Sequence, residues 1–279
     1  MRSYEVRQAH LMPADAAAYR PFFFHTRDFV LRNGEVPSTY TLLVHVDGEV
    51  FVRCHIALLT HEAVSLPKAS FGGFDLHPDC TVEDLVYAIE ALKNFCAEKH
   101  LPHIRIISYP ECYDSFSTQI IHEALIQCGA SVLYTDLSQY VIIGRDTFDE
   151  LIDPDERRHL NFARKQRWSF WQESSEMLAD AFDLIVNSRE AKGYPVTMTF
   201  EELSRAFSQF PDRYMLFSMR DELGKMVSVS VCIHVNEEVL YDFYHGDDLE
   251  WRKHSPVVPL ISGLYNYART HGYSLMDLG

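Results

Sequence analysis

Residues 239–279 read VLYDFYHGDDLEWRKHSPVVPLISGLYNYARTHGYSLMDLG, and this stretch decides the fold. The aromatic-rich run Val239–His245 is typical of a strand. The loop Gly246–Ser255 leads into a helix that we predict over Pro256–His271, because a glycine follows it. A last strand is predicted over Tyr273–Leu278. Strand, helix and strand in succession indicate an α/β fold with a mixed sheet.

Further strands and helices precede this stretch. Tyr214–Met219 and Met226–Val235 are predicted strands on either side of a turn around Gly224. Thr199 with Glu202 three residues later has the pattern of a capping box. Three helices are expected before these strands: Arg157–Arg167, Glu176–Lys192 and Thr199–Phe210. Ser169–Glu173 is expected as a strand between the first two of these helices.

The first half of the chain repeats this plan with little residue identity. Asp47-Gly48 is a strong hairpin signal, and it separates the predicted strands Thr41–Val46 and Val50–Leu59. A helix over Thr81–Lys99 and a strand over His103–Ser108 follow. The remaining expectations are a strand at residues 4–9, a helix from Met12 to Asn33, a continuation at Ala63–Leu66, a helix over Ser115–Cys128 and strand structure within Val132–Ile143.

The acidic segment 144–156, which contains Pro154, marks the boundary between the halves. A chain of 279 residues fits two domains of ordinary size. We therefore predict an N-terminal domain of residues 1–146 and a C-terminal domain of residues 147–279.

The composition restricts the partners. Hydrophobic residues make up 47% and charged residues 23%, which is typical of folded proteins. The net charge of -15 argues against DNA as a partner and disfavours tRNA, because both carry phosphate backbones. The N-terminus does not resemble a signal peptide, and no apolar window reaches the ~18 residues of a membrane span. These features predict a cytoplasmic protein without a membrane span.

The cysteines do not have the spacing of a metal site. No two of the six form a CxxC pair, so we expect reduced thiols and no bound metal. Motifs of zinc proteases, serine hydrolases and P-loop proteins are also absent. The cysteines are Cys54, Cys80, Cys96, Cys112, Cys128 and Cys232.

Several segments carry a resemblance to a known family. They are Ser70-Phe71-Gly72-Gly73-Phe74, the basic helix Arg157–Arg167, the tract from Asn187 to Gly193 with Phe200–Leu203, and Tyr244-His245 with Ser255-Pro256, Gly272-Tyr273 and Asp277-Leu278-Gly279. In these segments and in its element order, the chain resembles the GNAT acyltransferases. In tandem it is similar to the Fem-type peptidoglycan aminoacyltransferases.

This resemblance implies two tandem GNAT-like domains and transfer of an acetyl, acyl or aminoacyl group to an amine. The active site is expected in the cleft of the second domain. The donor would be acetyl-CoA or another acyl-CoA, with aminoacyl-tRNA as the alternative. The acceptor would be a small-molecule or peptide amine, which attacks a donor carbonyl held by backbone N–H groups of a splayed strand.

Two departures from the family pattern stand out. The family holds a cofactor pyrophosphate on a glycine-rich run, whereas the loop Gly246–Pro256 lacks that glycine spacing and contains three acids. The family also continues past Asp277-Leu278-Gly279 with a helix and a strand hairpin. Either this sequence is a piece of a longer chain, or its second domain lacks those elements.

The candidate catalytic residues are Asp242, Tyr244 and His245. Strict alternation along a strand puts Asp242 and Tyr244 on one face and His245 on the other. Acyl transfer to an amine needs a base for the ammonium proton and a donor for the leaving group, and a carboxylate with a nearby phenol can serve. The alternative is that this face packs in the core, with Asp242 satisfied by a hydrogen bond.

The candidate cofactor-binding residues are Arg252, Lys253, His254 and Ser255. They precede a helix, whose N-terminus attracts anions through its free N–H groups and its dipole. The alternative is a solvated turn with Ser255 as the N-cap. A related basic run, Arg157, Arg158, Arg164, Lys165 and Arg167, either contacts phosphate or forms a solvated helix face.

The candidate substrate-binding residues are Phe71, Gly72, Gly73 and Tyr109. Paired glycines let a ligand approach the backbone, or else they provide a turn with positive φ. Taken together, the sequence favours an acyltransferase. The alternative is a non-catalytic ligand-binding protein that kept the fold but lost the cofactor loop.

Overall fold

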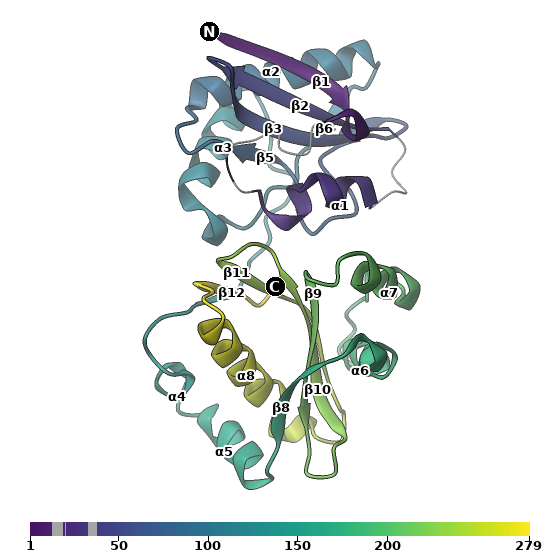
Figure 1. Cartoon of the computed structure of the whole chain (residues 1–279), viewed down its shortest axis with the longest axis vertical. Coiled ribbons are helices and arrows are strands. Elements are labelled where there is room, and N and C mark those ends of the chain that lie inside the picture. Colours follow the sequence, from purple (N-terminus) through teal and green to yellow (C-terminus); the bar gives the residue numbers. More distant parts are fainter. Residues whose placement is uncertain (13–18, 20, 33–37) are drawn as a thin grey trace. The chain divides into compact units, whose positions relative to one another are not determined.

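Each half of the chain folds around one six-stranded mixed sheet (Figure 1). The computed structural model describes residues 1–12, 19, 21–32 and 38–279. Its contacts divide the chain into two units, Met1–Leu137 and Ser138–Gly279. Residues 138–146, which the sequence analysis assigned to the first domain, supply strand β7 (Tyr140–Ile142) to the second sheet, where it pairs with β12 (Leu275–Asp277).

The first sheet has the order β1-β2-β3-β4-β6, and β5 pairs with β3 beside β4. Its strands are β1 (Arg2–Gln8), β2 (Thr39–Val46), β3 (Glu49–Leu58), β4 (Glu62–Val64), β5 (Phe74–Leu76) and β6 (His103–Arg105). The helices of this unit are α1 (Arg27–Arg32), α2 (Val82–Glu98) and α3 (Ser115–Gln127), with 3-10 turns η1 (Ala9–Leu11), η2 (Phe23–His25) and η3 (Glu111–Tyr113).

Local sequence signals account for several of these boundaries. Asp47 and Gly48 both have positive φ, as a two-residue hairpin turn requires, and they join β2 to β3. The Thr81–Asp84 capping box is present and starts α2. In the first half the helix expected from Met12 to Asn33 is shorter. The Oγ1 atom of Thr26 accepts the N–H of Phe29 at 3.3 Å, so α1 begins only after Thr26. Residues 13–18, 20 and 33 of that expectation lie outside the described residues.

The second sheet has the order β7-β12-β11-β10-β9-β8. Its further strands are β8 (Ser169–Glu173), β9 (Tyr214–Arg220), β10 (Met226–His234) and β11 (Val239–Asp247). The helices are α4 (Phe148–Leu151), α5 (Arg157–Lys165), α6 (Leu178–Glu190), α7 (Phe200–Gln209) and α8 (Val257–Thr270), with 3-10 turns η4 (Ser175–Met177) and η5 (Arg252–His254). Of the segment Val132–Ile143, only β7 is a strand.

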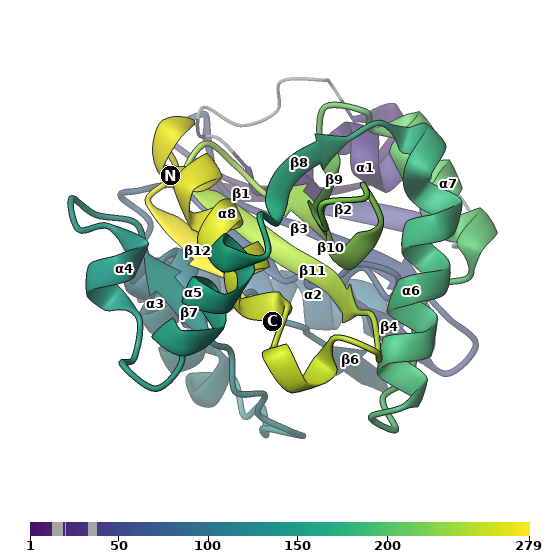
Figure 2. The same ribbon diagram turned by 90° about the horizontal axis from the view of Figure 1, so that it is seen from below.

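Helices cover both faces of the second sheet. Helices α6 and α7 lie on one side, and α8 lies with α4 and α5 on the other (Figures 1 and 2). The apolar face of α8 packs on this sheet through Leu260, Leu264 and Ala268, which are fully buried. Burial of a leucine side chain contributes roughly 1.5–3 kcal/mol, so α8 is held firmly.

The two units share one plan, as the sequence predicted. In the second unit, α8 connects β11 to β12, and these strands pair in parallel. In the first unit, α2 precedes β6, which pairs in parallel with β4. Antiparallel strands complete both sheets. No helix among the described residues is long and apolar enough to span a membrane.

Candidate active site

A β-bulge in the pairing of β10 with β11 rearranges the predicted catalytic residues. The register runs Val231 opposite Tyr244 and then Cys232 opposite Asp242, so Phe243 is an extra residue. A bulge shifts the alternation of side chains by one position. Asp242 and His245 therefore share a face, and Tyr244 lies on the opposite one. The expectation from strict alternation, which paired Asp242 with Tyr244, was wrong for this reason.

Asp242 and His245 form a hydrogen-bonded pair. Nδ1 of His245 lies 2.9 Å from Oδ2 of Asp242, whose side chain is fully buried. The hydrogen bond that His245 donates to Asp242 raises the pKa of His245, while partial burial and the charges of Lys192 and Arg189 lower it; the net direction is upward. The His245 side chain is 32% exposed. This arrangement makes Nδ1 the donor and leaves Nε2 as the basic atom of the ring.

Tyr244 makes its contacts with the segment between α6 and α7. Its hydroxyl accepts the N–H of Thr197 at 3.0 Å and that of Met198 at 3.2 Å. It also exchanges a hydrogen bond with Oγ1 of Thr197. The guanidinium of Arg189 lies 5.2 Å from the centre of the Tyr244 ring. The phenol therefore holds the segment just before α7, and its hydrogen bonds are made there.

The edge of β11 that faces β12 is paired only in part. The parallel register covers Val239–Tyr241 opposite Leu275–Asp277, and β11 continues to Asp247. Across the described residues, no strand pairs with Phe243–Asp247 on that side. Gly246 permits the close packing of this end on α6, since a Cβ there would stand 2.6 Å from Cα of Ile185.

The three acids at the end of β11 and in the loop that follows are all paired with cations. Buried Asp247 accepts from Ser188 Oγ at 2.6 Å, and it pairs with Lys192 at 3.2 Å and with Arg252 at 3.3 Å. Asp248 and Glu250 both pair with Lys225, at 2.7 and 3.2 Å. Burial raises the pKa of Asp247, but Ser188 and Lys192 outweigh it and the net shift is downward. The negative charges of these three acids are thus balanced by lysine and arginine side chains in the fold.

The four predicted cofactor-binding residues are in different environments. Arg252 is engaged by Asp247 and by the carbonyl oxygen of Ser188 at 3.2 Å. His254 stacks on Phe162 of α5, with ring centres 3.7 Å apart, and Lys253 is exposed. Ser255 has φ 47° and is the C-cap of η5, where its N–H donates to the carbonyl of Arg252 at 3.0 Å; the N-cap of α8 is Pro256 and not Ser255. Only Lys253 of this group is a cation free for a ligand.

The predicted substrate-binding residues lie in the core of the first unit. Phe71 and Tyr109 are 2% and 4% exposed and pack with Phe22 and Tyr113. Gly72 lies close to the backbone of Ser65, and Gly73 has φ +91°. Local structure therefore accounts for a glycine at both positions. Their contact with a substrate remains a prediction.

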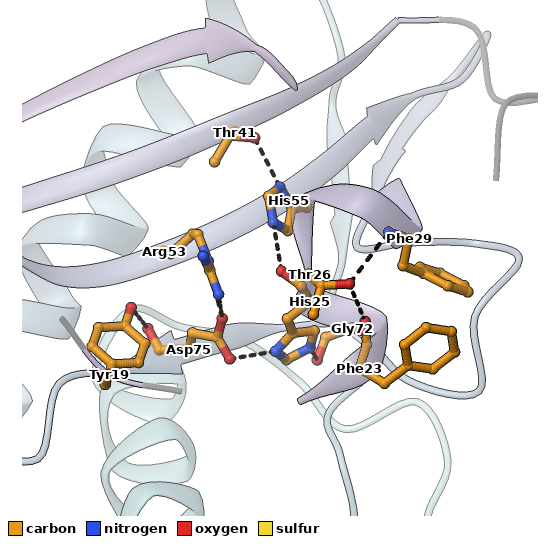
Figure 3. A network of polar contacts seen from close by, with 10 residues as sticks. All are labelled: Tyr19, Phe23, His25, Thr26, Phe29, Thr41, Arg53, His55, Gly72 and Asp75. Carbon is orange, nitrogen blue, oxygen red and sulfur yellow. Dashed lines mark hydrogen bonds and ion pairs between the residues drawn. The ribbon is translucent and has the colours of Figure 1, made fainter. Parts of the chain in front are cut away.

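A buried charged network in the first unit was missed from the sequence (Figure 3). Asp75 pairs with His25 Nδ1 at 2.5 Å and with Nε of Arg53 at 3.0 Å, and Nε2 of His25 donates to the carbonyl of Gly72 at 2.8 Å. Burial raises the pKa of Asp75, but His25 and Arg53 outweigh it and lower the value to about 2. No sequence motif links these three residues, which come from η2, β3 and β5.

His55 extends this network (Figure 3). Its Nε2 donates to the carbonyl of His25 at 3.1 Å, and its Nδ1 lies 2.8 Å from Thr41 Oγ1. Burial and the charge of Arg53 lower the pKa of His55 to about 3, so the ring is neutral. All members of this network are buried, and their hydrogen bonds join η2, β2, β3 and β5 to one another and to Gly72.

Two arginines of the basic helix α5 bind the residue Asp149 of α4. Arg164 of the basic helix forms two hydrogen bonds to Asp149, at 2.8 and 2.6 Å, and Arg157 donates to the carbonyl of Asp149. Within the described part of the chain, no group of three or more His, Cys, Asp or Glu side chains is arranged to hold a metal ion.

Solved structures share this arrangement of two units, each folded around a mixed sheet. The structure is similar to the crystal structure of FemX, with 13% identity over 99% of this chain and 88% of that chain, at a TM-score of 0.70. L-PGS from Bacillus licheniformis is 12% identical over 84% of this chain and 66% of that chain, at a TM-score of 0.56. A conserved protein of unknown function from Bacteroides thetaiotaomicron is 8% identical over 90% of this chain and 79% of that chain, at a TM-score of 0.54.

In sequence, no protein-family model and no curated protein matches the chain. The similarity in structure to FemX extends over nearly the whole chain and includes both units. The fold is therefore the Fem-like fold of two tandem mixed α/β units that the sequence predicted.

Proposed function

We propose that this protein transfers an acetyl, longer acyl or aminoacyl group from an activated thioester or ester donor to an amine. The observation that carries this proposal is the Asp242–His245 pair on β11, at the end where β12 no longer pairs with that strand. A basic Nε2 on a partly exposed ring, next to an unpaired strand edge, fits the needs of acyl transfer to an amine.

In this mechanism the donor carbonyl accepts hydrogen bonds from backbone N–H groups of β11. The amine attacks the carbonyl carbon, a C–N bond forms, and Nε2 of His245 takes the proton that the nitrogen loses. The C–S or C–O bond of the donor then breaks, and the proton on Nε2 passes to the leaving thiolate or alkoxide. Asp242 positions the ring and stabilises the imidazolium between these two transfers.

Tyr244 has a different role in this proposal from the one expected in the sequence analysis. Its hydroxyl is engaged with Thr197 and Met198, so His245 supplies both proton transfers. Tyr244 instead holds the segment before α7 against β11. For a phosphate-bearing donor, we assign contact to Lys253 and to the first turn of α8, because Arg252 already neutralises Asp247.

The test is an acyl-transfer assay with acetyl-CoA, longer acyl-CoAs and aminoacyl-tRNAs as donors. Amino acids, amino sugars, short peptides and polyamines serve as acceptors, and mass spectrometry detects the products. We expect transfer by the wild type and a loss of roughly 10²-fold or more in His245→Gln, as expected for a missing general base. The control Glu250→Gln, an exposed loop acid, keeps full activity.

Two results would overturn the proposal. One is the absence of transfer from every donor, and the other is full activity of His245→Gln. Donor binding without transfer would instead identify a non-catalytic binding protein.

A further inference from the structure

Four polar side chains form an unbroken row inside the second unit. Cys232 Sγ lies 3.1 Å from Ser230 Oγ, Ser230 Oγ lies 2.6 Å from Asp242 Oδ1, and the other oxygen of Asp242 contacts His245. Ser230 and Cys232 are fully buried. The row runs from the apolar core to the accessible ring of His245.

The bulge creates this row. Ser230 stands opposite His245 in the register, and Cys232 stands opposite Asp242, because Phe243 has no partner of its own. Residues 230 and 232 share one face of β10, and the bulge brings residues 242 and 245 of β11 to that same face. A regular strand pair would separate these four side chains.

The direction of the hydrogen bonds follows from the donors available. The Asp242 carboxylate only accepts, so Ser230 gives its single hydroxyl hydrogen to Oδ1. The Ser230 oxygen then accepts from the thiol of Cys232, which burial keeps protonated by raising its pKa well above the ordinary value. Both oxygens of Asp242 are thereby occupied, one by Ser230 and one by His245.

We propose that Ser230 is a positioning residue, whose hydroxyl fixes the Asp242 carboxylate so that His245 keeps its hydrogen on Nδ1 and presents a bare Nε2 to the substrate. This inference rests on the proposed function. Without Ser230, one oxygen of a buried carboxylate loses its partner, and the carboxylate rotates to seek another. His245 then loses the geometry that selects its tautomer.

Other charged groups act on His245 but do not select its tautomer. Lys192 and Arg189 on α6 lower its pKa, and Asp242 on its own strand raises it. On β10, Ser230 contacts Asp242 directly, and Cys232 reaches it through the hydroxyl of Ser230. Among all these groups, Asp242 is the one that accepts the hydrogen on Nδ1 of His245. The tautomer of His245 therefore reports on the carboxylate that Ser230 holds.

The experiment is a measurement of the His245 ring tautomer by 15N NMR on histidine-labelled full-length protein. His245→Gln assigns the signal, and the spectra are recorded well above the ring's pKa. We expect the wild type to hold the Nδ1–H tautomer and Ser230→Ala to show a mixture with the Nε2–H form. In an assay of turnover, Ser230→Ala should lower kcat about 10-fold and leave KM unchanged. This loss is smaller than the full contribution of a general base, because the base itself is still present.

The matched control is Ser228→Ala. Ser228 is a buried serine on the same strand, but its hydroxyl donates to the carbonyl of Pro256 at 2.8 Å and not to Asp242. This variant should keep the Nδ1–H tautomer while losing comparable stability. If Ser230→Ala fails to fold, Ser230→Cys keeps the volume and has only a weak donor, and it should give the same mixture.

The proposal is overturned if Ser230→Ala or Ser230→Cys keeps the wild-type ring shifts, or if Ser228→Ala changes them equally. The NMR measurement of the tautomer needs no enzymatic activity, so its outcome is independent of the acyl-transfer assay. A protein with the expected tautomer shift and no transfer activity would refute the proposed reaction and leave the role of Ser230 intact.

Discussion

Nδ1 of His245 lies 2.9 Å from Oδ2 of Asp242, although the two residues are three positions apart on one strand. Residues at this spacing point to opposite faces of a regular strand. The extra residue Phe243 removes that separation. The site thus depends on a local irregularity of the backbone that a sequence pattern does not display.

Asp242→Asn should weaken the base and shift its pH dependence. The base acts in its neutral form, so kcat/KM rises with pH through the pKa of His245, which the hydrogen bond to Asp242 raises. In Asp242→Asn this rise should move to lower pH, and the maximal rate should fall roughly 10²-fold or more because the wrong tautomer is favoured. The pH profile of kcat/KM measures both effects, and an unchanged profile would contradict the assignment. Glu250→Gln is the control.

Tyr244→Phe should loosen the segment before α7. The substitution keeps the ring beside Arg189 but leaves the N–H groups of Thr197 and Met198 without their acceptor. Removing a buried hydrogen-bond partner costs about 1–3 kcal/mol. Hydrogen exchange of a peptide covering residues 194–199 should speed up, with little change elsewhere. Tyr140→Phe, at an exposed tyrosine, should leave that peptide as in the wild type; equal exchange in both variants would refute the contact.

Gly246→Ala should destabilise the second unit. A Cβ at this position would stand 2.6 Å from Cα of Ile185, a backbone atom of α6 that cannot move without shifting the helix. We expect a loss of about 1–3 kcal/mol, typical of overpacking. Tryptophan fluorescence measures it, since Trp168, Trp171 and Trp251 all lie in this unit. Gly144→Ala is the matched control, because a Cβ there meets nothing within 4 Å; similar stability of the two variants would rule out the close approach.

The first unit should lose stability in acid through Asp75. Its pKa in the folded protein is about 2, below the ordinary value of a free aspartate. The stabilisation is therefore present above about pH 4 and disappears as the pH falls through about 2, and it amounts to roughly 2 kcal/mol. Hydrogen exchange of β3 and β5 measures this loss. Asp75→Asn should be less stable near neutrality and have a flatter acid dependence, whereas Asp79→Asn, at an exposed residue, should match the wild type.

Much of the fold was predictable because its signals are local. The hairpin at Asp47-Gly48 and the capping boxes at Thr81 and Thr199 each act within a few residues, and the structure contains all three. The helix expected from Met12 onward differs because Thr26 offers its side chain to Phe29 and starts a shorter helix. Such competition between side chain and backbone is weakly encoded in composition.

The site was predictable in its residues but not in its geometry. Asp242 and His245 were selected for their chemistry, yet their contact depends on which residue the bulge leaves unpaired. Ser230 was missed because a serine within an apolar strand resembles ordinary core packing. The network of His25, Arg53 and Asp75 was missed because its members are brought together only by tertiary structure.

The most direct test of an acyl-transfer role is thermal unfolding of the second unit, followed by tryptophan fluorescence, with a panel of donors. The panel contains acetyl-CoA, longer acyl-CoAs, free coenzyme A and aminoacyl-tRNA. A donor at 100 times its Kd stabilises the folded protein by about 2.7 kcal/mol, which is a shift of a few degrees. We predict such a shift with at least one acyl donor, in the wild type and equally in His245→Gln. No shift with any member of the panel would contradict the account.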